Sequence, residues 1–397
     1  DPATLHLGIE IHIKCIEMRQ RSVELQQKSV KMHSKHALSD EVLQNAFVHM
    51  YAKCGSFQLA KNIFFGDNGP RGSVIAWNSM IGGYVEHDQF MEALILYYNM
   101  FEECITPDKV TFIGILDAFS GLAILAEGKR IHCIIISFGY DSDVIVATSL
   151  IKFYEKCLCI DEARGVFDRM NRRDVIVWNS MLAAYVKNVN SIKAFELYEK
   201  MKDEGVQPNE VTFVSILGVC TSVENLSQGK VIHSDLEKFG FESNIIVGTA
   251  LVGMYSECGD VVGAENAFRC LKEHDVVSWT AMQVVYIKQG HGIEALWIYL
   301  KMQHEGIYPN QHTIAAGLRA CAHIVDMDEK IFVQGEESNK MIAFFIGKAL
   351  HVFACEQGLA ANLLVNNALI TLYGKCGAIE EAEAVFSCAS EHDVALW

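Results

Sequence analysis

The stretch Val175-Ile176-Val177-Trp178-Asn179-Ser180-Met181 decides the fold, because near copies of it lie 101 residues before and after it. The copies are Val74-Ile75-Ala76-Trp77-Asn78-Ser79-Met80 and Val276-Val277-Ser278-Trp279-Thr280-Ala281-Met282. Pro107, Pro208 and Pro309 follow with the same spacing. Self-similarity at a fixed period predicts a repeat array, in which each unit buries its apolar face against its neighbours.

Two further words recur inside this period and divide it. One is Tyr-x-x-Cys, found at Tyr51–Cys54, Tyr154–Cys157, Tyr255–Cys258 and Tyr373–Cys376. The other begins Gly-Lys and ends in His, and it is found at Gly128–His132, Gly229–His233 and Gly347–His351. The period is therefore a triplet of related but unequal units.

Apolar residues after Val175 follow helical spacing in two runs. The first run is Trp178, Met181, Leu182 and Tyr185, and the second is Ala194, Leu197, Tyr198 and Met201. Residues 188–191 separate the runs, and Gly205 and Pro208 follow the second. The pattern predicts a helix, a turn and a second helix that ends before the proline.

Applied along the chain, this parse gives units of 35, 35 and 31 residues in repeating order. They are 41–73, 74–108, 109–143, 144–174, 175–209, 210–244, 245–275, 276–310, 311–362 and 363–393. Residues 1–40 form a degenerate remnant of a unit, and residues 394–397 start another. We predict an all-α fold, an α-solenoid superhelix of about ten helix-turn-helix repeats.

Three places depart from this arithmetic. There are 17 extra residues near 330–346, 17 more within 18–36, and two in the 66–72 loop. We interpret the longer insertions as surface loops or as errors of gene-model splicing. The chain also begins at Asp1 without methionine and ends at Trp397 inside a repeat word, so we expect it to be a fragment.

The composition weighs against several functional classes. A formal charge of −16 disfavours nonspecific binding of polyanions, which depends on lysine and arginine, although an array can gather its cations on one face. The 13 cysteines include no C-x-x-C, and six of them recur at equivalent places. We therefore expect small buried helix residues in a reducing compartment, with no metal, cofactor or disulfide. The most apolar stretch, near 341–354, is broken by Lys348 and His351, so no membrane partner is expected.

Unit lengths in the order 35, 35 and 31, together with these words, resemble the P, L and S motifs of plant pentatricopeptide repeat (PPR) proteins of the PLS subclass. The units beginning at 74, 175 and 276 are P-like, those at 109, 210 and 311 L-like, and those at 41, 144, 245 and 363 S-like. The remnant at 1–40 is L-like. The resemblance implies that each repeat reads one base of single-stranded RNA with two or three side chains.

In this family the pairing residues are the fifth and the last of each unit, and the P-like and S-like units have polar residues at both. The pairs are Asn45 with Ser73, Asn78 with Asp108, Thr148 with Asp174, Asn179 with Asn209, Thr249 with Asp275, Thr280 with Asn310, and Asn367 with Asp393. The L-like units have Ile113, Val214 and Ala315 at the fifth place, which offer no hydrogen bond to a base edge. By the family's code the resemblance implies the site C-U-n-G-Y-n-G-A-n-U, read 5′ to 3′.

The resemblance implies two further contacts to RNA. The second residue of each unit would pack on base faces: Val42, Ile75, Val110, Ile145, Ile176, Val211, Ile246, Val277 and Leu364, with His312 as an exception. Lysines near the end of the first helix would contact phosphate: Lys53, Lys156, Lys187, Lys288 and Lys375. Glu86 and Glu257 replace lysine in two units, which weakens contacts there.

Structural interpretations compete with these roles. The repeated tryptophans lie on the apolar stripe and are predicted to be core residues, not stacking platforms. His132, His233 and His351 lie on an apolar face and are predicted to be packed or hydrogen-bonded rather than ligands. A single Asn or Asp at a helix start is ordinarily a cap. Polar pairs that recur at equivalent positions, with apolar residues in one unit type only, favour a role in RNA recognition.

The function predicted from the resemblance is guidance of organellar C-to-U RNA editing in a mitochondrion or chloroplast. The partners would be organellar single-stranded RNA and editing cofactor proteins or a deaminase, supplied in cis or in trans. A splicing or stabilisation factor remains an alternative, as does a tetratricopeptide-like scaffold that binds peptides. We expect no enzymatic activity in this chain, because the deaminase signature H-x-E with P-C-x-x-C is missing, as are phosphate-binding glycine loops.

Overall fold

The computed structural model describes residues 33–388 except 67–68, 221–222, 327–338 and 360. Within these residues the regular structure is entirely helical, which confirms the all-α prediction. The chain divides into two compact parts, Asp1–Asn190 and Ser191–Trp397. Each part is described separately below.

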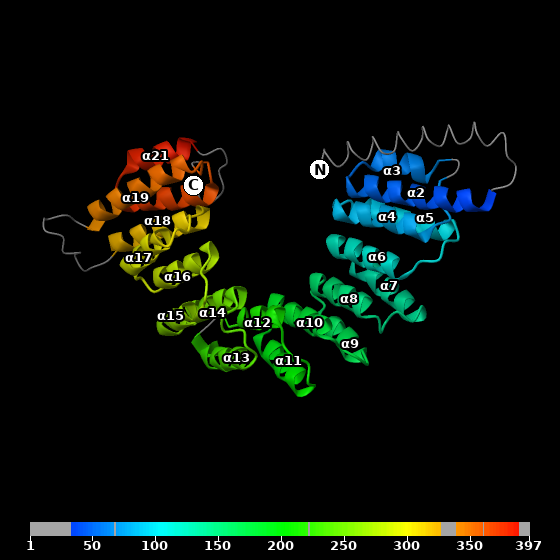
Figure 1. Cartoon of the computed structure of the whole chain (residues 1–397), viewed down its shortest axis with the longest axis horizontal. Coiled ribbons are helices and arrows are strands. Elements are labelled where there is room, and N and C mark those ends of the chain that lie inside the picture. The colour runs from blue at the N-terminus through cyan, green and yellow to red at the C-terminus, as the bar shows by residue number, and fades with distance from the viewer. Residues whose placement is uncertain (1–32, 67–68, 221–222, 327–338, 360, 389–397) are drawn as a thin grey trace. The chain divides into compact units, whose positions relative to one another are not determined.

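In the first compact part, long helices alternate as the first and second members of antiparallel hairpins (Figure 1). The helices are α2 (His33–Lys53), α3 (Phe57–Phe64), α4 (Val74–Glu86), α5 (Phe90–Glu102), α6 (Lys109–Leu122), α7 (Leu125–Ser137), α8 (Val144–Lys156), α9 (Ile160–Arg169) and α10 (Val175–Lys187). The first helices α2, α4, α6, α8 and α10 pack on one another in chain order. This packing is that of a solenoid.

The second compact part continues the same pattern. Its elements are α11 (Ser191–Asp203), α12 (Glu210–Leu217), the 3-10 turn η1 (Val223–Asn225), α13 (Leu226–Lys238), α14 (Ile245–Glu257), α15 (Val261–Cys270), α16 (Val276–Lys288), α17 (Gly292–His304), α18 (Gln311–Asp326), α19 (Asn339–Glu356), α20 (Leu363–Cys376) and α21 (Ile379–Cys388). Here α12, α14, α16, α18 and α20 pack in chain order. The polar pairs assigned from the sequence begin on these first helices.

From α4 onward, each first helix starts where a predicted unit starts, and from α6 onward the last residue of one unit caps the first helix of the next. Side-chain oxygens at unit ends accept hydrogen bonds from backbone N–H groups in the first turn of α6, α8, α10, α12, α14, α16, α18 and α20. Such caps satisfy the donors that a helix N-terminus leaves unpaired. Ser73 before α4 makes no such bond. The unit boundaries themselves stay a prediction.

The repeated tryptophans are part of the hydrophobic core. Trp77 and Trp178 are fully buried and Trp279 nearly so. Each indole meets a phenylalanine of the preceding helix edge to face, with ring centroids 4.8 Å apart for Phe64 and Trp77. The corresponding distances are 4.8 Å for Phe167 with Trp178 and 4.9 Å for Phe268 with Trp279. The prediction that these tryptophans are core residues is confirmed.

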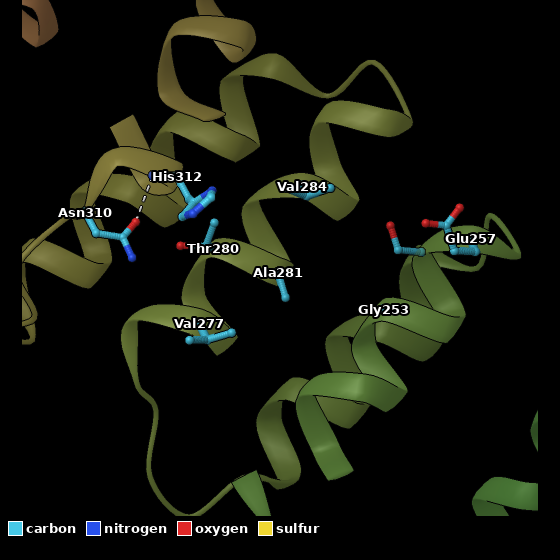
Figure 2. Close-up of a pocket in the computed structure, with 9 residues that line it drawn as sticks. Gly253, Glu257, Val277, Thr280, Ala281, Val284, Asn310 and His312 are labelled. Atoms are coloured by element: carbon cyan, nitrogen blue, oxygen red, sulfur yellow. Dashed lines mark hydrogen bonds between the residues drawn. The ribbon is translucent and has the colours of Figure 1, made fainter. Parts of the chain in front are cut away.

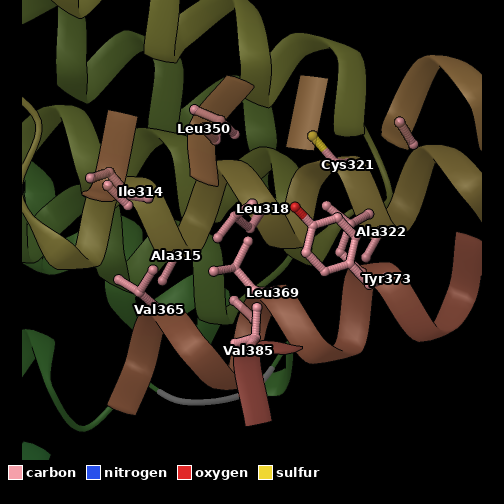
Figure 3. Packing of buried hydrophobic residues seen from close by; sticks show 14 of the residues in the cluster. Ile314, Ala315, Leu318, Cys321, Ala322, Leu350, Val365, Leu369, Tyr373 and Val385 are labelled. Atoms are coloured by element: carbon pink, nitrogen blue, oxygen red, sulfur yellow. The ribbon is translucent and has the colours of Figure 1, made fainter. Parts of the chain in front are cut away.

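Buried residues from the five helices α17 to α21 form a core near the end of the described chain (Figure 3). Ile314 and Leu318 of α18 pack with Leu350 of α19 and with Leu369 of α20, and Val385 of α21 closes the cluster. This core fixes the first helices α18 and α20 side by side.

Two helices differ from the sequence expectation. The helix α2 begins at His33, before the predicted unit start at residue 41. In the later insertion, residues 339–346 are helical and belong to α19, so the loop interpretation is wrong for them. The cause is visible in the burial pattern, since Ala343, Gly347, Leu350 and Ala354 form one buried stripe at helical spacing. Residues 327–338 and 1–32 lie outside the described residues.

Candidate nucleic-acid interface

The second residue of each predicted unit is an exposed apolar side chain at the start of a first helix. Eight of them are more than half exposed: Val42, Ile75, Val110, Ile145, Ile176, Val211, Ile246 and Val277. Leu364 is half-buried, and His312, the exception in the sequence, is exposed at the same place. Scattered exposed apolar residues need no explanation, but exposure at one equivalent position in successive units is typical of a binding surface.

The structure brings the two members of a polar pair together in the first two units. Asn45 Nδ2 donates to Ser73 Oγ at 3.0 Å, and Asn78 Nδ2 donates to Asp108 Oδ1 at 2.9 Å. The Thr111 hydroxyl donates to Asn78 Oδ1 at 2.7 Å. Asn45 Oδ1 is buried and has no hydrogen-bond partner among the described residues. An unsatisfied amide oxygen at this place suits a ligand with a hydrogen-bond donor.

In the unit 276–310 the pair is bridged by a third residue. Thr280 Oγ1 lies 2.6 Å from the Val276 carbonyl oxygen and 2.8 Å from Thr313 Oγ1. Asn310 Oδ1 accepts from the backbone N–H groups of His312 at 2.9 Å and Thr313 at 3.1 Å. The Asn310 oxygen is thus committed to the cap, while its amide N–H₂ group stays available as a donor within the described part.

Two further pairs, Thr148 with Asp174 and Thr249 with Asp275, are not joined by hydrogen bonds to each other among the described residues. Thr148 donates to the Val144 carbonyl, and Asp174 and Asp275 cap α10 and α16. Asn179 is buried in the first compact part, while Asn209 caps α12 in the second. Thr249 and Asn367 are half-buried, and Asn367 Oδ1 lacks a hydrogen-bond partner among the described residues. Asp393 lies outside the described residues.

Capping alone explains why the unit ends are Asp or Asn. Asp143, Asn244 and Asn362 end units whose fifth residue is apolar, and they cap helices in the same way. The cap interpretation is therefore confirmed for the Asp and Asn residues at the described unit ends, but not for Ser73. What separates the two classes of unit is the fifth residue: Ile113 and Val214 are half-buried and Ala315 is fully buried, and none of them offers a polar group.

In the second compact part, a pocket of about 320 Å³ lies where two second residues and one polar pair come together (Figure 2). Val277 and His312, second residues of successive units, line it together with Thr280 and Asn310. Gly253, Ser256 and Glu257 of α14 form another wall. The volume falls at the lower end of the range for small-molecule sites. Apolar walls beside one polar pair suit a planar group with hydrogen-bonding edges.

The lysine row is largely occupied by acidic partners from neighbouring units, which the sequence interpretation missed. Lys53 pairs with Glu86, Lys187 Nζ lies 3.1 Å from Glu155 Oε2, Lys288 Nζ lies 2.5 Å from Glu257 Oε1, and Lys375 Nζ lies 2.5 Å from Asp326 Oδ2. Lys156 is exposed and makes no ion pair among the described residues. Glu86 and Glu257 thus bind the lysines of adjacent units.

The histidines of the Gly-Lys word make one recurring hydrogen bond. The Nδ1 atoms of His132 and His233 lie 2.8 Å from the hydroxyls of Tyr154 and Tyr255, and His351 Nδ1 lies 3.0 Å from that of Tyr373. The prediction of hydrogen-bonded, packed histidines is confirmed. Burial, followed by the charge of Arg169, lowers the pKa of His132 to about 4.

This burial predicts that acid weakens the fold. An unfolded histidine has a pKa of about 6.5. Between pH 6.5 and 4, the histidine is therefore protonated in the unfolded chain but neutral in the folded one. The contribution of neutral His132 to the free energy of unfolding is complete above this pH range and falls as the pH decreases through it. We expect His132→Gln to remove up to about 2 kcal/mol of the stability difference between pH 7 and pH 5. Denaturant unfolding at the two pH values measures it, and equal pH dependence in the variant would contradict the assignment.

Within the described residues there is no cluster of three or more His, Cys, Asp or Glu that could hold a metal ion. None of the described helices is both long and apolar enough to cross a bilayer. The described cysteines are free. Of the repeat-equivalent ones, Cys220, Cys258 and Cys321 are buried, whereas Cys54, Cys157 and Cys376 are only half-buried.

Two family models match the chain. The PPR repeat family model matches residues 72–121 and 173–221, and the PPR repeat model matches residues 145–175, 277–307 and 367–394.

Among curated relatives from Arabidopsis thaliana, pentatricopeptide repeat-containing protein At2g33680 is 32% identical over 100% of this chain and 50% of its own length. The chloroplastic At1g11290 protein is 32% identical over 88% of this chain and 41% of its own. The mitochondrial At2g03380 protein is 30% identical over 90% of this chain and 49% of its own. The chain thus spans about half the length of these relatives.

Among solved structures, the pentatricopeptide repeat protein PPR10 in complex with an 18-nt psaJ RNA element aligns with a TM-score of 0.43 and 15% identity. The alignment covers 98% of this chain and 77% of that one.

Proposed function

Because the chain belongs to the pentatricopeptide repeat family, we propose that it binds single-stranded RNA in a sequence-specific manner. The observation that carries the proposal is the pocket of Figure 2, in which the second residues of two successive units flank one polar pair. A base placed there would contact Val277 and His312 with its faces. Its edge would meet the Asn310 amide and the Thr280 hydroxyl.

The same arrangement defines the order of reading. Exposed second residues recur along each compact part, so successive bases would be held one per unit. We assign the units to the P, L and S types of the PLS subclass, with L units making no edge contact because Ile113, Val214 and Ala315 are apolar. The RNA site is then C-U-n-G-Y-n-G-A-n-U. The pairs named above supply its letters, and Lys156 with its equivalents supplies the phosphate contacts.

The biological role that we propose is recognition for C-to-U editing of an organellar transcript. The curated relatives include chloroplastic and mitochondrial proteins, and they are about twice as long as this chain. A deaminase or editing cofactor protein would be supplied in cis or in trans. Splicing or stabilisation of a transcript would use the same recognition step.

A competition gel shift tests the recognition step. The chain is titrated with a short RNA carrying C-U-n-G-Y-n-G-A-n-U and with a version in which G and A are exchanged. Three letters change, and each mispaired base costs about 1 to 3 kcal/mol, so we expect at least roughly 100-fold weaker binding. Equal affinities would refute the base assignments.

The bases opposite the L units give a matched control in the same assay. Changing the three n positions to any base leaves the proposed edge contacts intact, so the affinity should stay within about twofold, well below the cost of one mispaired base. Strong discrimination at these positions would show that the units are read in a different order.

A further inference from the structure

The three predicted units that contain Trp77, Trp178 and Trp279 are called the tryptophan units below, each taken together with the end of the unit before it. They differ in the residue that this end places beside the indole. In the second of them, Arg173 Cζ lies 4.8 Å from the Phe167 ring centroid and 6.0 Å from that of Trp178. Its Nε donates to the Phe167 carbonyl oxygen at 2.9 Å. The arginine side chain thus covers the aromatic pair. In the first tryptophan unit, the Arg71 carbonyl oxygen accepts from Trp77 Nε1 at 2.8 Å.

The third tryptophan unit has His274 at the place of Arg173, and a pocket of about 390 Å³ is open there. His274 stacks on Phe268 with ring centroids 4.2 Å apart. Trp279 and Lys301 are among the residues that line the pocket. Trp279 Nε1 and His274 Nδ1 are buried and have no hydrogen-bond partner among the described residues. Buried polar atoms without partners are uncommon, and here they adjoin an open pocket.

The charges around the pocket favour an anionic group. Lys301 Nζ lies 5.9 Å from the Trp279 ring centroid, and Lys301 makes no ion pair among the described residues. Glu265 is already bound by Arg269 at 2.8 Å and by the Tyr286 hydroxyl at 2.8 Å. Glu305 is the other acid of the lining. An ammonium, an indole N–H and an imidazole without acceptors together suit a carboxylate.

An apolar surface adjoins this polar pocket. Trp297 is 68% exposed and Leu300 is 56% exposed on α17, and with Ile298, Lys301 and His304 they line a second pocket of about 410 Å³. Ile298 and Lys301 belong to both pockets. We call the two together the α17 surface. An exposed tryptophan beside a leucine and a cation is typical of an interaction site.

The equivalent helices of the other tryptophan units show that the repeat itself does not require this surface. In α11 the places of Trp297 and Leu300 are taken by Glu196 and Glu199, which are exposed. In α5 they are taken by Ile95 and Tyr98, but Asn99 stands where α17 has Lys301. Trp178 Nε1 is also buried without a hydrogen-bond partner among the described residues, but the helix beside it, α11, has Glu196 and Glu199 in place of the apolar residues. Of these three helices, α17 alone has exposed apolar residues at both of these places and a cation beside them, next to unpartnered polar atoms.

We propose that the α17 surface binds an acidic amphipathic segment of a protein partner. An apolar side chain of the segment lies against Trp297 and Leu300. A carboxylate one helical turn away meets Lys301, Trp279 Nε1 and His274. Trp297 and Leu300 lie on a second helix, whereas the pocket of Figure 2 is lined by residues of the first helices α14, α16 and α18 and by Asn310, and the α17 surface shares no lining residue with it. Binding here is therefore separate from the proposed RNA site, and either proposal can fail alone.

The test selects a phage-displayed library of short peptides on the full chain. Counter-selection uses the variant Trp297→Glu with Leu300→Glu, which copies the outer face of α11. We expect the recovered peptides to combine a large apolar residue with Asp or Glu one helical turn away. Their affinities, read from tryptophan fluorescence, should fall about tenfold or more with Lys301→Gln and with peptides that carry Gln in place of the acid.

Two controls separate this effect from misfolding. RNA binding and the thermal midpoint of the Trp297→Glu, Leu300→Glu variant should match the wild type. Glu305→Gln should strengthen binding of the acidic peptides, a gain that a damaged fold would not produce. Recovery of peptides without acids, of basic peptides, or of none that distinguish wild type from the counter-selection variant would overturn the proposal.

Discussion

Replacing Thr280 by Asn together with Asn310 by Asp is expected to change the preferred base of that unit from A to U. The double variant copies the pair Asn78 and Asp108 of the first tryptophan unit, where the amide donates to the carboxylate at 2.9 Å. Thr313 also has an equivalent there, because the Thr111 hydroxyl donates to Asn78 Oδ1. The substitution therefore transplants a complete polar arrangement that this chain already builds.

The physical reason for the change lies in the donor that is removed. Asn310 uses its oxygen for the helix cap and offers N–H₂ to the pocket, whereas an aspartate offers only oxygen. A base edge that accepts a hydrogen bond from Asn310 would face a carboxylate instead. If the wild type favours A and the double variant favours U, each by about 1 to 3 kcal/mol, the ratio of the affinities for A and U should shift roughly 100-fold.

The measurement is a set of dissociation constants for RNAs that differ only at the eighth letter of the proposed site. The thermal midpoint should stay close to that of the wild type, because Asp108 of the copied pair already caps α6. RNAs changed at the seventh letter, read by Thr249 and Asp275, should show no altered preference. An unchanged preference for A at the eighth letter would show that the fifth and last residues are wrongly assigned.

Much of the fold was predictable because the determining signals are local and repeated. The word around Trp178 sets a buried stripe, and the Asp or Asn before each first helix sets where the helix begins. The helical part of the later insertion was missed, although Ala343 and Gly347 continue the spacing of Leu350 and Ala354. The number of residues between the recurring motifs shows where an insertion lies, but it does not show which secondary structure the insertion forms.

For the candidate site, the sequence predicts which residues take part, and this stays a prediction; it does not predict how their side chains are hydrogen-bonded. The sequence identified Thr280 and Asn310 but not the bridge through Thr313, because that hydroxyl belongs to the following unit. The open pocket beside Trp279 has His274 where Arg173 covers Phe167 and Trp178, and the sequence alone does not show that this place is open. Contacts between successive units follow from how the helices pack, which periodicity alone does not specify.

The lysine row leads to the last prediction, that removing two acids strengthens RNA binding. Glu86 and Glu257 hold Lys53 and Lys288, and all four side chains are about half exposed. Exposed ion pairs contribute little to stability, so Glu86→Gln with Glu257→Gln should leave unfolding almost unchanged. The freed lysines would then meet phosphates without competition. We expect about tenfold tighter binding, and a steeper dependence of log K on log salt by roughly 0.7 per freed lysine.

The control must match the change in net charge, since the chain carries a formal charge of −16. Glu92→Gln with Glu196→Gln removes two exposed acids from the second helices α5 and α11 and leaves the lysine row as it is. Lys156, which has no acidic partner among the described residues, provides the opposite control: Lys156→Gln should lower both the affinity and the salt slope. Glu155 is left alone because its side chain is only 11% exposed, and removing it would disturb packing.

The salt slope decides between the two roles of these lysines. If they contact phosphate once freed, the slope steepens only in the variant that lacks Glu86 and Glu257. If the pairs serve only to join neighbouring units, the test variant and the charge-matched control will give the same affinity and the same slope. That result would remove Lys53 and Lys288 from the RNA site and leave Lys156 as the unpaired cation of the described row.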